Sequence, residues 1–514
     1  MTKGYKPVKI RLLVGLAVSA SLTAGMAFAQ SPTPGYNTPV PENIMTPDQV
    51  ESTIGTLNFV DGMPTAETSK LVYDNLDLLR GVETFLNGIP ATSIAAMRLG
   101  QQSVGAVLPN QVMIMDQFLD STPLFLTGNT GTVYVSSFLD LGRDGPTVIE
   151  VPPGMGPGTV DDAFFRFVID LGGPGPDKGK GGKYLILPPE YDGEVPDGYF
   201  VASSPSYINW VIMRGLIVDG KPDAANKTIK EGLKIYPLSQ KDAQPKMEFI
   251  SVSGTEFNTI HANTFDFYAE LAEVINREHI GFLDPELRGL FASVGIEKGK
   301  PFAPDERMTR ILTESAKIAN ATARAIAFDT RDENAYLFPD SAWKTAFIGG
   351  DYQWLKDEGN GGRNLDARIL FFYQATVNTP AMAWEIPGVG SSYALAERDS
   401  NWDYLDGAKN YKMTIPADVP AKNFWSIVVY DAQTRSELQT SQPLPSKNSA
   451  RGGFDINADG STDLYFGPKA PVGKERNWIA TVPGKSWFTY LRLYGPGETW
   501  FDRSWKPSEI TLTE

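Results

Sequence analysis

The spacing of apolar residues divides the chain into stretches of different expected structure. From residue 46 to about residue 105 the apolar positions recur at helical spacing, and Thr46 opens a capping box with proline at the first helical position. We therefore predict that this whole stretch is helical. The apolar residues that fall on one face of the predicted helix are Leu71, Leu78, Val82 and Phe85.

Short apolar runs take over from residue 112 to about residue 219. Runs such as TVIEV and KYLILP are separated by Gly/Pro turns, which is typical of an antiparallel sandwich or barrel. The segment GGPGPDKGKGGK is predicted to be a solvated hairpin loop, because neither a helix nor a central strand tolerates that much glycine and proline. Its spacing does not match a phosphate-binding loop.

Helical patterns return over residues 220–330, residues 330–395 are mixed, and strands dominate again from about residue 400. FWSIVVY is apolar on both faces apart from one serine, which predicts a central strand covered on both sides. In SWFTYLRLY, alternation places Trp487, Thr489, Leu491 and Leu493 on one face and Phe488, Tyr490, Arg492 and Tyr494 on the other. We therefore predict a β-rich α+β chain with two β-rich units and helical segments before and between them.

The N-terminus has the pattern of a secretory signal. A basic start is followed by LLVGLAVSASLTAGMAFA and the small-x-small site Ala27-Phe28-Ala29, so we expect cleavage before Gln30. An uncleaved membrane anchor is the alternative, but the run is a little short and is interrupted by Ser, Thr and Gly. No later stretch is apolar over the roughly 18 residues that a span needs. We expect a soluble periplasmic or secreted protein with no transmembrane span after cleavage.

The predicted organisation is a signal peptide at 1–29, a flexible leader at 30–45, a helical lead-in plus N-terminal β domain at 46–219, a helical connecting region at 220–395 and a C-terminal β domain at 396–514. Cleavage would remove four basic residues and no acidic one, so the formal charge of −15 becomes −19. Such a surface repels nucleic acid and anionic lipid, and we expect neither as a partner. The chain has no cysteine, which excludes disulfides, thiol nucleophiles and thiolate zinc sites.

Several blocks of sequence resemble one exported bacterial family. They include NTIHANTFDFYAEL and LDARILFFYQATVNTPAM in the middle of the chain, and LDGAKNYKMTIP, PAKNFWSIVVYDAQTRS and DGSTDLYFGP nearer its end. Over most of residues 100–510 the chain resembles the paired domains of unknown function twelve-fifty-four (N-terminal) and twelve-fourteen (C-terminal). The resemblance implies two tandem β-sandwich-like domains and export from the cytoplasm. It implies no defined substrate.

The first candidate site combines Asp431, Arg435 and His261 as catalytic residues. Asp431 and Arg435 follow the predicted central strand, in the kind of loop that often carries function. Asp431 can form an Asx-turn, and Arg435 can pair with a carboxylate. His261 is predicted at or before the start of a helix that begins near Thr264, where a capping or packing role is the alternative. For His279, near the end of that helix, we expect an interaction with the helix dipole.

The second candidate is a divalent-cation site, and the sequence suggests no other cofactor. Oxygen-bearing residues alternate, with Gly460 at the sixth position, as in a short loop that wraps calcium. Phe466 stands where that loop requires a glutamate, and a hairpin turn at the Asp-Gly pair is the alternative. The predicted ligands are Asp455, Asn457, Asp459 and Asp463.

The third candidate is the aromatic strip around Arg492, with Tyr490 and Tyr494. Such a strip suits stacking a sugar ring or gripping a carboxylate, and the alternative is a second packed face with the arginine paired to an acid. The other residues predicted to bind substrate are Asn477, Trp478 and Arg398.

Two functions follow from these patterns. One is an exported hydrolase that uses carboxylates, with or without a metal, on a small molecule or glycan fragment in a cleft between the domains. The other is a non-catalytic ligand-binding or cell-envelope interaction protein. The sequence does not determine the oligomeric state.

Overall fold

The structure, a computed structural model, describes residues 38–513, which fall into two compact units, residues 38–71 and residues 72–513. The predicted signal peptide and the first part of the predicted leader lie outside the described residues. Helices account for 28% and strands for 27%, with several sheets and helical segments between them, which confirms the predicted α+β class. None of the helices within residues 38–513 combines the length and apolar character that a membrane span requires.

The first unit contains a small antiparallel sheet where the sequence had predicted helix. β1 (Gln49–Ser52), β2 (Gly55–Val60) and β3 (Met63–Pro64) pair in this order. Gly55 has a φ of 125°, which favours glycine, and it stands opposite Ser52 at the turn. Helix α1 (Ala66–Ser103) follows Thr65, whose Oγ1 accepts a hydrogen bond from the Thr68 N–H at 3.2 Å. The prediction of helix over residues 46–65 was therefore wrong, because the tight turn and the strand-forming TLNFV outweigh the apparent capping box.

The second unit contains an N-terminal β-sandwich. The six-stranded sheet has the order β13-β4-β5-β11-β7-β8, and the four-stranded sheet has the order β10-β9-β6-β12. Buried residues of both sheets, such as Val135 and Val211 on one and Ile149 and Ile186 on the other, share one core. Residues 172–181 of GGPGPDKGKGGK form a loop, as predicted, but the loop is not a hairpin, because β8 and β9 lie in different sheets. The strands are β4 (Gln111–Ile114), β5 (Val133–Asp140), β6 (Thr147–Val151), β7 (Gly158–Asp162), β8 (Phe167–Leu171), β9 (Gly182–Leu187), β10 (Phe200–Ser203), β11 (Ile208–Gly215), β12 (Lys234–Pro237) and β13 (Glu248–Ser251).

A second β-sandwich forms the C-terminal part of the same unit. Its sheets have the orders β14-β15-β21-β17-β18 and β20-β19-β16-β22, and Ile427 and Leu491 on one share a core with Met413 and Leu464 on the other. β17 contains FWSIVVY and lies between β21 and β18, which confirms the predicted central strand. The strands are β14 (Lys344–Thr345), β15 (Ser391–Ala396), β16 (Asn410–Ile415), β17 (Ala421–Asp431), β18 (Ser446–Asn448), β19 (Thr462–Gly467), β20 (Trp478–Ala480), β21 (Trp487–Pro496) and β22 (Thr511–Thr513).

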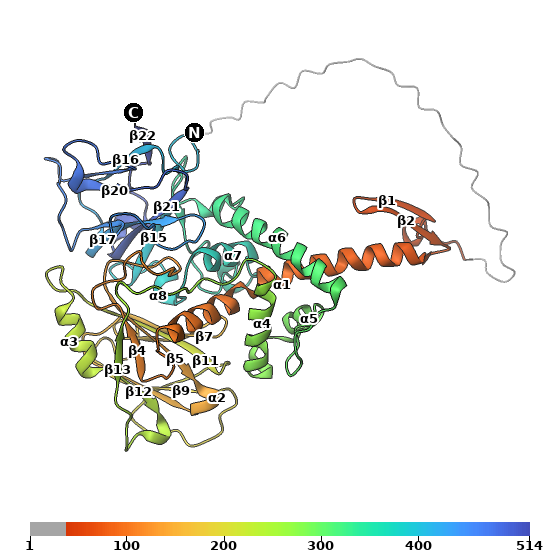
Figure 1. Ribbon diagram of the computed structural model, residues 1–514, viewed down its shortest axis with the longest axis horizontal. Helices are drawn as coiled ribbons and strands as arrows, with labels where there is room; N and C mark the ends of the chain where they lie inside the picture. Colours follow the sequence, from red (N-terminus) through yellow and green to blue (C-terminus); the bar gives the residue numbers. More distant parts are fainter. Residues whose placement is uncertain (1–37, 514) are drawn as a thin grey trace, which may run out of the picture. The chain divides into compact units, whose positions relative to one another are not determined.

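Helices fill the space between the two sandwiches. One large core joins apolar residues of several helices to one face of each larger sheet, for example Trp210 of β11 and Tyr490 of β21. The short helix α8 lies next to β15 (Figure 1). The helices are α2 (Leu141–Asp144), α3 (Asp223–Gly232), α4 (Asp266–Arg277), α5 (Pro285–Ala292), α6 (Glu306–Phe328), α7 (Leu365–Gln374), α8 (Pro380–Ala383) and α9 (Glu498–Phe501). Short 3-10 turns occur at Glu42–Ile44, Leu238–Gln240, Ile280–Phe282, Glu333–Ala335, Asp357–Gly359 and Glu475–Asn477.

Candidate functional site

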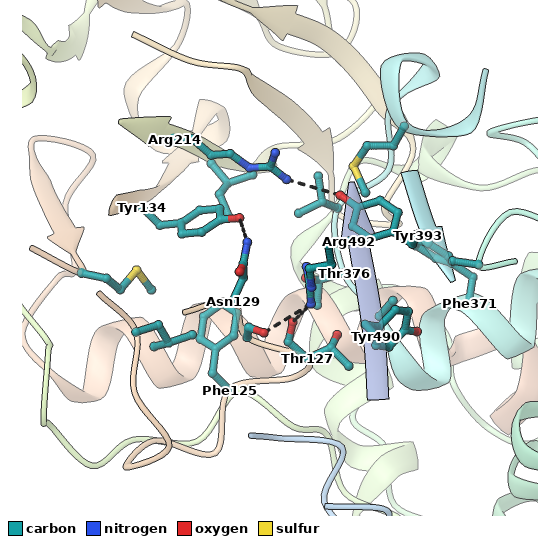
Figure 2. Close-up of a pocket in the computed structure, with 18 residues that line it drawn as sticks. Phe125, Thr127, Asn129, Tyr134, Arg214, Phe371, Thr376, Tyr393, Tyr490 and Arg492 are labelled. Carbon is teal, nitrogen blue, oxygen red and sulfur yellow. Dashed lines mark hydrogen bonds between the residues drawn. The ribbon is translucent and has the colours of Figure 1, made fainter. Parts of the chain in front are cut away.

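A pocket lies where the two sandwiches and the segment after α7 meet (Figure 2). The space between its walls is about 650 Å³, counting the part that is open to solvent. One part of the lining is apolar and the other is polar. The apolar part includes Met115, Leu119, Phe125, Phe371, Val377 and Met382. The polar part includes Thr127, Asn129, Tyr134, Arg214, Thr376, Tyr393, Tyr490 and Arg492.

The pleat of two strands aims the polar residues at the pocket. On β21, Leu491 and Leu493 enter the sandwich core, so Tyr490 and Arg492 take the opposite face and line the pocket. The alternation predicted for SWFTYLRLY is thereby confirmed. On β11, Arg214 faces the pocket by the same alternation. The two sandwiches therefore each direct one arginine toward the same space.

Arg492 is buried without an acidic partner. Its Nη2 donates to the carbonyl oxygens of Thr127 and Gly128 at 3.1 and 3.3 Å and to the Tyr430 hydroxyl at 2.6 Å. Its Nε is buried and has no hydrogen-bond partner among residues 38–513. No carboxylate of the described chain lies within ion-pair distance, 4.0 Å, of this guanidinium. An unsatisfied buried donor costs about 1–3 kcal/mol, which a bound acceptor would recover.

Arg214 is held from the C-terminal sandwich and also has no acid in ion-pair contact within the described part of the chain. Its Nη1 donates to Ser391 Oγ at 2.9 Å and its Nη2 to the Tyr393 hydroxyl at 3.3 Å. The guanidinium carbon lies 5.6 Å and 5.2 Å from the ring centres of Tyr134 and Tyr494. These neutral contacts orient the charge but do not neutralise it.

Asn129 arranges the phenols beside the two arginines. Its Nδ2 donates to the hydroxyl oxygens of Tyr134, at 2.8 Å, and Tyr494, while its Oδ1 accepts from the Gly131 N–H. Both phenol oxygens therefore act as acceptors here, which leaves their hydrogens to donate. Burial raises the pKa of Tyr134, but the positive charges of Arg214 and Arg492 and the hydrogen bond from Asn129 lower it more, so its net pKa falls below 10. The electric field at this point favours a negative charge.

The polar part of the pocket is therefore a group of donors around an unneutralised positive charge. Among the described residues that line it, none is Asp, Glu or His. Glu437 is close enough to interact with Arg492 but lies outside the lining, and burial raises the pKa of Glu437 well above its ordinary value, which favours its neutral form. Arginines and phenolic hydroxyls of this kind suit a carboxylate or a phosphate.

Two further spaces adjoin the pocket. A second chamber, of about 420 Å³ including its open part, continues past Arg214, and a wide polar groove meets the pocket at Ala346, Met382 and Tyr393. Met382 lines all three spaces, so this flexible side chain lies where they meet. The residues that line both the pocket and the second chamber are Tyr134, Ile212, Arg214, Val377 and Met382.

The wall between the spaces is the segment from Ala375 to Met382, which is fixed to the N-terminal sandwich. The Asn378 N–H donates to Asp161 at 2.9 Å, and the Thr379 hydroxyl donates to Asp170 at 2.7 Å. Val377 has a φ of 72°, a strained conformation for a β-branched residue. Tertiary contacts therefore hold this segment in a conformation that it would not adopt alone.

The three residues predicted to be catalytic lie outside the pocket lining. Asp431 forms the predicted Asx-turn with the Gln433 N–H at 2.7 Å and an ion pair with Lys485. Arg435 is fully buried with its guanidinium 4.2 Å from the Tyr373 ring centre, and its carbonyl accepts from the N–H of the lining residue Thr127. Predicted pairing of Arg435 with a carboxylate is not seen among the described residues.

His261 precedes α4, as expected, but it packs in an aromatic core. Its ring lies edge-on to those of Phe85, Phe267 and Tyr373, and its Nδ1 donates to the Ala262 carbonyl at 2.9 Å. Burial and the nearby Arg435 lower its pKa to about 3, so the ring is neutral. His279 caps the 3-10 turn that follows α4, where its Nδ1 accepts from the Gly281 N–H.

The other predicted binding residues are also engaged elsewhere. Arg398 pairs with Asp329 at 2.8 Å and stacks over Tyr404. Asn477 donates to the Asp455 and Asp463 carbonyls, and Trp478 donates to the Gly467 carbonyl. None of these lies among the described lining residues of the pocket. Of the predicted substrate-binding set, the structure places Arg492 and Tyr490 in the lining, and the Tyr494 hydroxyl accepts from the lining residue Asn129.

The predicted cation ligands make hydrogen bonds and ion pairs with their neighbours. Asp455 pairs with Arg476 at 2.7 Å, Asp463 pairs with Lys412 at 3.0 Å, and Asp459 accepts from Ser461. Asn457 donates to the Ser461 hydroxyl at 2.9 Å. Within residues 38–513 no group of three or more His, Asp or Glu side chains is placed to hold a metal ion.

Sequence reasoning missed Arg214, Tyr134 and Asn129. A signal was present in INWVIMRG, where alternation leaves an arginine at the end of an otherwise apolar strand face, as in SWFTYLRLY. Asn129 gave no such signal, because its role depends on a loop that joins two phenols from different sandwiches.

The chain carries two domains of unknown function in the predicted order. Residues 109–237 match the family described as protein of unknown function (DUF1254), and residues 390–498 match protein of unknown function (DUF1214). No curated protein matches the chain. These family descriptions indicate no activity.

Two solved structures are similar to the chain at low sequence identity. The VPA0106 protein from Vibrio parahaemolyticus is 16% identical, with a TM-score of 0.53 over 85% of this chain and 100% of that chain. An uncharacterized protein from Burkholderia cenocepacia is 11% identical, with a TM-score of 0.39 over 87% and 97% of the two chains. The first of these supports the fold alone.

Proposed function

We propose that this chain is an exported protein that binds a small anionic molecule in the pocket between its two β-sandwiches. The observation that carries the proposal is that Arg492, which is buried, and Arg214, which is half-buried, face one space without an acid in ion-pair contact in the described chain. A buried charge is costly unless it is paired, and a bound anion would supply the missing partner.

The rest of the lining restricts the ligand further. Phe125, Phe371 and Ile212 form apolar walls opposite the donors, so the molecule has an apolar body attached to its anionic group. A neutral glycan fragment would leave both guanidinium charges unpaired. We therefore favour a carboxylate or phosphate that carries aliphatic or aromatic carbon.

Binding is better supported than hydrolysis by carboxylates. A pair of carboxyl groups on either side of a scissile bond is needed for glycoside cleavage. The described residues that line the pocket include no Asp or Glu, and the predicted acid Asp431 is paired with Lys485 outside it. We therefore propose ligand binding without catalysis as the function of this pocket.

The test compares charged ligands with their neutral isosteres. Benzoate and hexanoate, with inorganic phosphate as a third probe, are titrated into the chain from Gln30 by calorimetry at low ionic strength, beside benzamide and hexanamide. We expect the anions to bind and the amides to bind at least about tenfold more weakly, a difference of about 1.4 kcal/mol. The matched variants are Arg492→Met in the pocket and Arg398→Met outside it. Equal affinity for benzoate and benzamide would contradict the proposal.

A further inference from the structure

The second chamber carries a polar group of opposite sign to those of the pocket. Asp170, on β8, is 9% exposed and lines this chamber. Its Oδ1 accepts from the Thr379 hydroxyl at 2.7 Å. In the described part of the chain no donor is recorded for Oδ2, so one carboxylate oxygen remains available. The donors of the pocket thus lead to an acceptor in the adjoining chamber.

Apolar residues make up much of the lining between these two ends, together with the Tyr134 ring. Ile212, Val377 and Met382 line both spaces, and Pro157, Pro174 and Met213 line the second chamber alone. Shared lining residues mean that the two spaces adjoin on either side of Arg214. A single extended ligand would therefore meet donors, then apolar surface, then an acceptor.

We propose that the ligand is an elongated molecule with an anionic group at Arg214 and Arg492, an apolar middle beside Val377 and Met382, and a hydrogen-bond-donating end, hydroxyl or ammonium, at Asp170. This inference rests on the proposed anion-binding function and names the class of molecule: an ω-hydroxy or ω-amino acid.

The surroundings of Asp170 agree with this role. Burial raises the pKa of Asp170 to about 6, against the opposing effects of Thr379 and Lys178, so the carboxyl is mainly ionised at neutral pH. An ionised carboxylate accepts from either a hydroxyl or an ammonium group. An ammonium end gains more binding free energy than a hydroxyl, because its positive charge also balances the buried carboxylate.

The experiment uses one carbon chain with three different ends. Octanoate and its ω-hydroxy and ω-amino derivatives are titrated into the chain from Gln30 at neutral pH, with the hexanoate series to vary length. We expect a donor-terminated ligand to bind about tenfold more tightly than the methyl-terminated one. Asp170→Asn should abolish most of the advantage of the ammonium end, whereas Asp192→Asn, which changes an exposed acid, should retain it.

A second variant separates ligand contact from support of the loop. Thr379→Val removes the hydrogen bond to Asp170 but keeps the carboxylate, so it should retain the preference for a donor-terminated ligand. If Thr379→Val loses this preference as fully as Asp170→Asn, Asp170 acts by anchoring the loop and the inference is overturned. Equal affinity for all three ends in the unmodified chain also overturns it, while anion binding stands. If no carboxylate of either length binds, the proposed function itself fails.

Discussion

Two buried cations in the same five-stranded sheet differ in whether an acid neutralises them. Lys344, on β14, is fully buried and pairs with Glu397 at 2.7 Å, and it also donates to the Ala327 carbonyl at 3.0 Å. Arg492, on β21, is nearly as buried, yet its hydrogen bonds go to carbonyl and hydroxyl oxygens. The first charge is balanced within the fold and the second is not.

The difference separates a structural charge from a binding charge. Lys344 and Glu397 connect the sheet to the last turn of α6 through Ala327, and the pair borders no described pocket. Arg492 borders an open space that also receives Arg214. A buried charge left unbalanced beside a cavity therefore points to a ligand, whereas a balanced one points to the scaffold.

The largest expected effect is on the balanced pair. Glu397→Gln leaves the Lys344 charge buried without a counter-ion, so we expect the free energy of unfolding to fall by about 3–5 kcal/mol, measured by urea denaturation. The double variant Lys344→Met with Glu397→Leu removes both charges and should recover most of this loss. If the free energy of unfolding falls by less than about 1 kcal/mol in Glu397→Gln, Glu397 is not the group that balances the Lys344 charge.

Arg492→Met should have its main effect on binding. Loss of a buried charged partner costs about 3 kcal/mol of ligand affinity, or somewhat more than a hundredfold in Kd. We expect its effect on unfolding to be smaller than that of Glu397→Gln, because an unpaired charge is removed rather than created. Calorimetry with benzoate, alongside urea denaturation of the same variant, checks both parts. If Arg492→Met unfolds as readily as Glu397→Gln but still binds benzoate, Arg492 stabilises the fold and does not bind the ligand.

Period-two patterns predicted much of the fold of the C-terminal sandwich. The alternation in SWFTYLRLY placed Arg492 and Tyr490 on the face opposite the sandwich core, and FWSIVVY gave a central strand. Both predictions depend on local geometry alone. The helix predicted from Thr46 was wrong, because a short polar stretch can satisfy both a capping pattern and a hairpin, and the sheet pairing decides between them.

The candidate site was only partly predictable. Arg492 was identified from its strand, but its lack of an acidic partner depends on the fold, which brings the backbone carbonyls of Thr127 and Gly128 and the hydroxyl of Tyr430 to its guanidinium. Those residues are far from it in sequence. The clustered acids Asp455 and Asp459 were predicted to bind a cation, whereas the structure shows them bonded to nearby residues.

A buried acid extends the comparison between Lys344 and Arg492. Glu278 is buried, borders none of the three spaces described above, and has no cation within ion-pair distance in residues 38–513. It accepts from the N–H groups of Tyr207 and Ile208, and burial raises its pKa to about 7. The folded chain therefore holds this proton more tightly than the unfolded chain between the ordinary carboxyl pKa of 4.5 and about 7.

This linkage sets the sign of a pH effect. The contribution of Glu278 to stability is most favourable below pH 4.5 and declines as the pH rises to about 7, by on the order of 3 kcal/mol. Urea denaturation at several pH values should show a shallower decline in Glu278→Gln than in the unmodified chain. Identical slopes would mean that this acid is not protonated in the folded state.

The smallest effect is expected at Tyr134, which tests whether the donors act together with the charges. Tyr134→Phe keeps the ring that Arg214 covers at 5.6 Å but removes a hydroxyl donor, so benzoate affinity should fall by about 1 kcal/mol, roughly fivefold. Tyr73→Phe, at an exposed tyrosine, should leave affinity unchanged. An ultraviolet titration gives an independent readout, because the arginines lower the pKa of Tyr134 below 10, and Arg214→Gln should raise it again. If Tyr134→Phe binds benzoate as tightly as the unmodified chain, the guanidinium groups alone hold the anion. The Tyr134 hydroxyl would then have a structural role only.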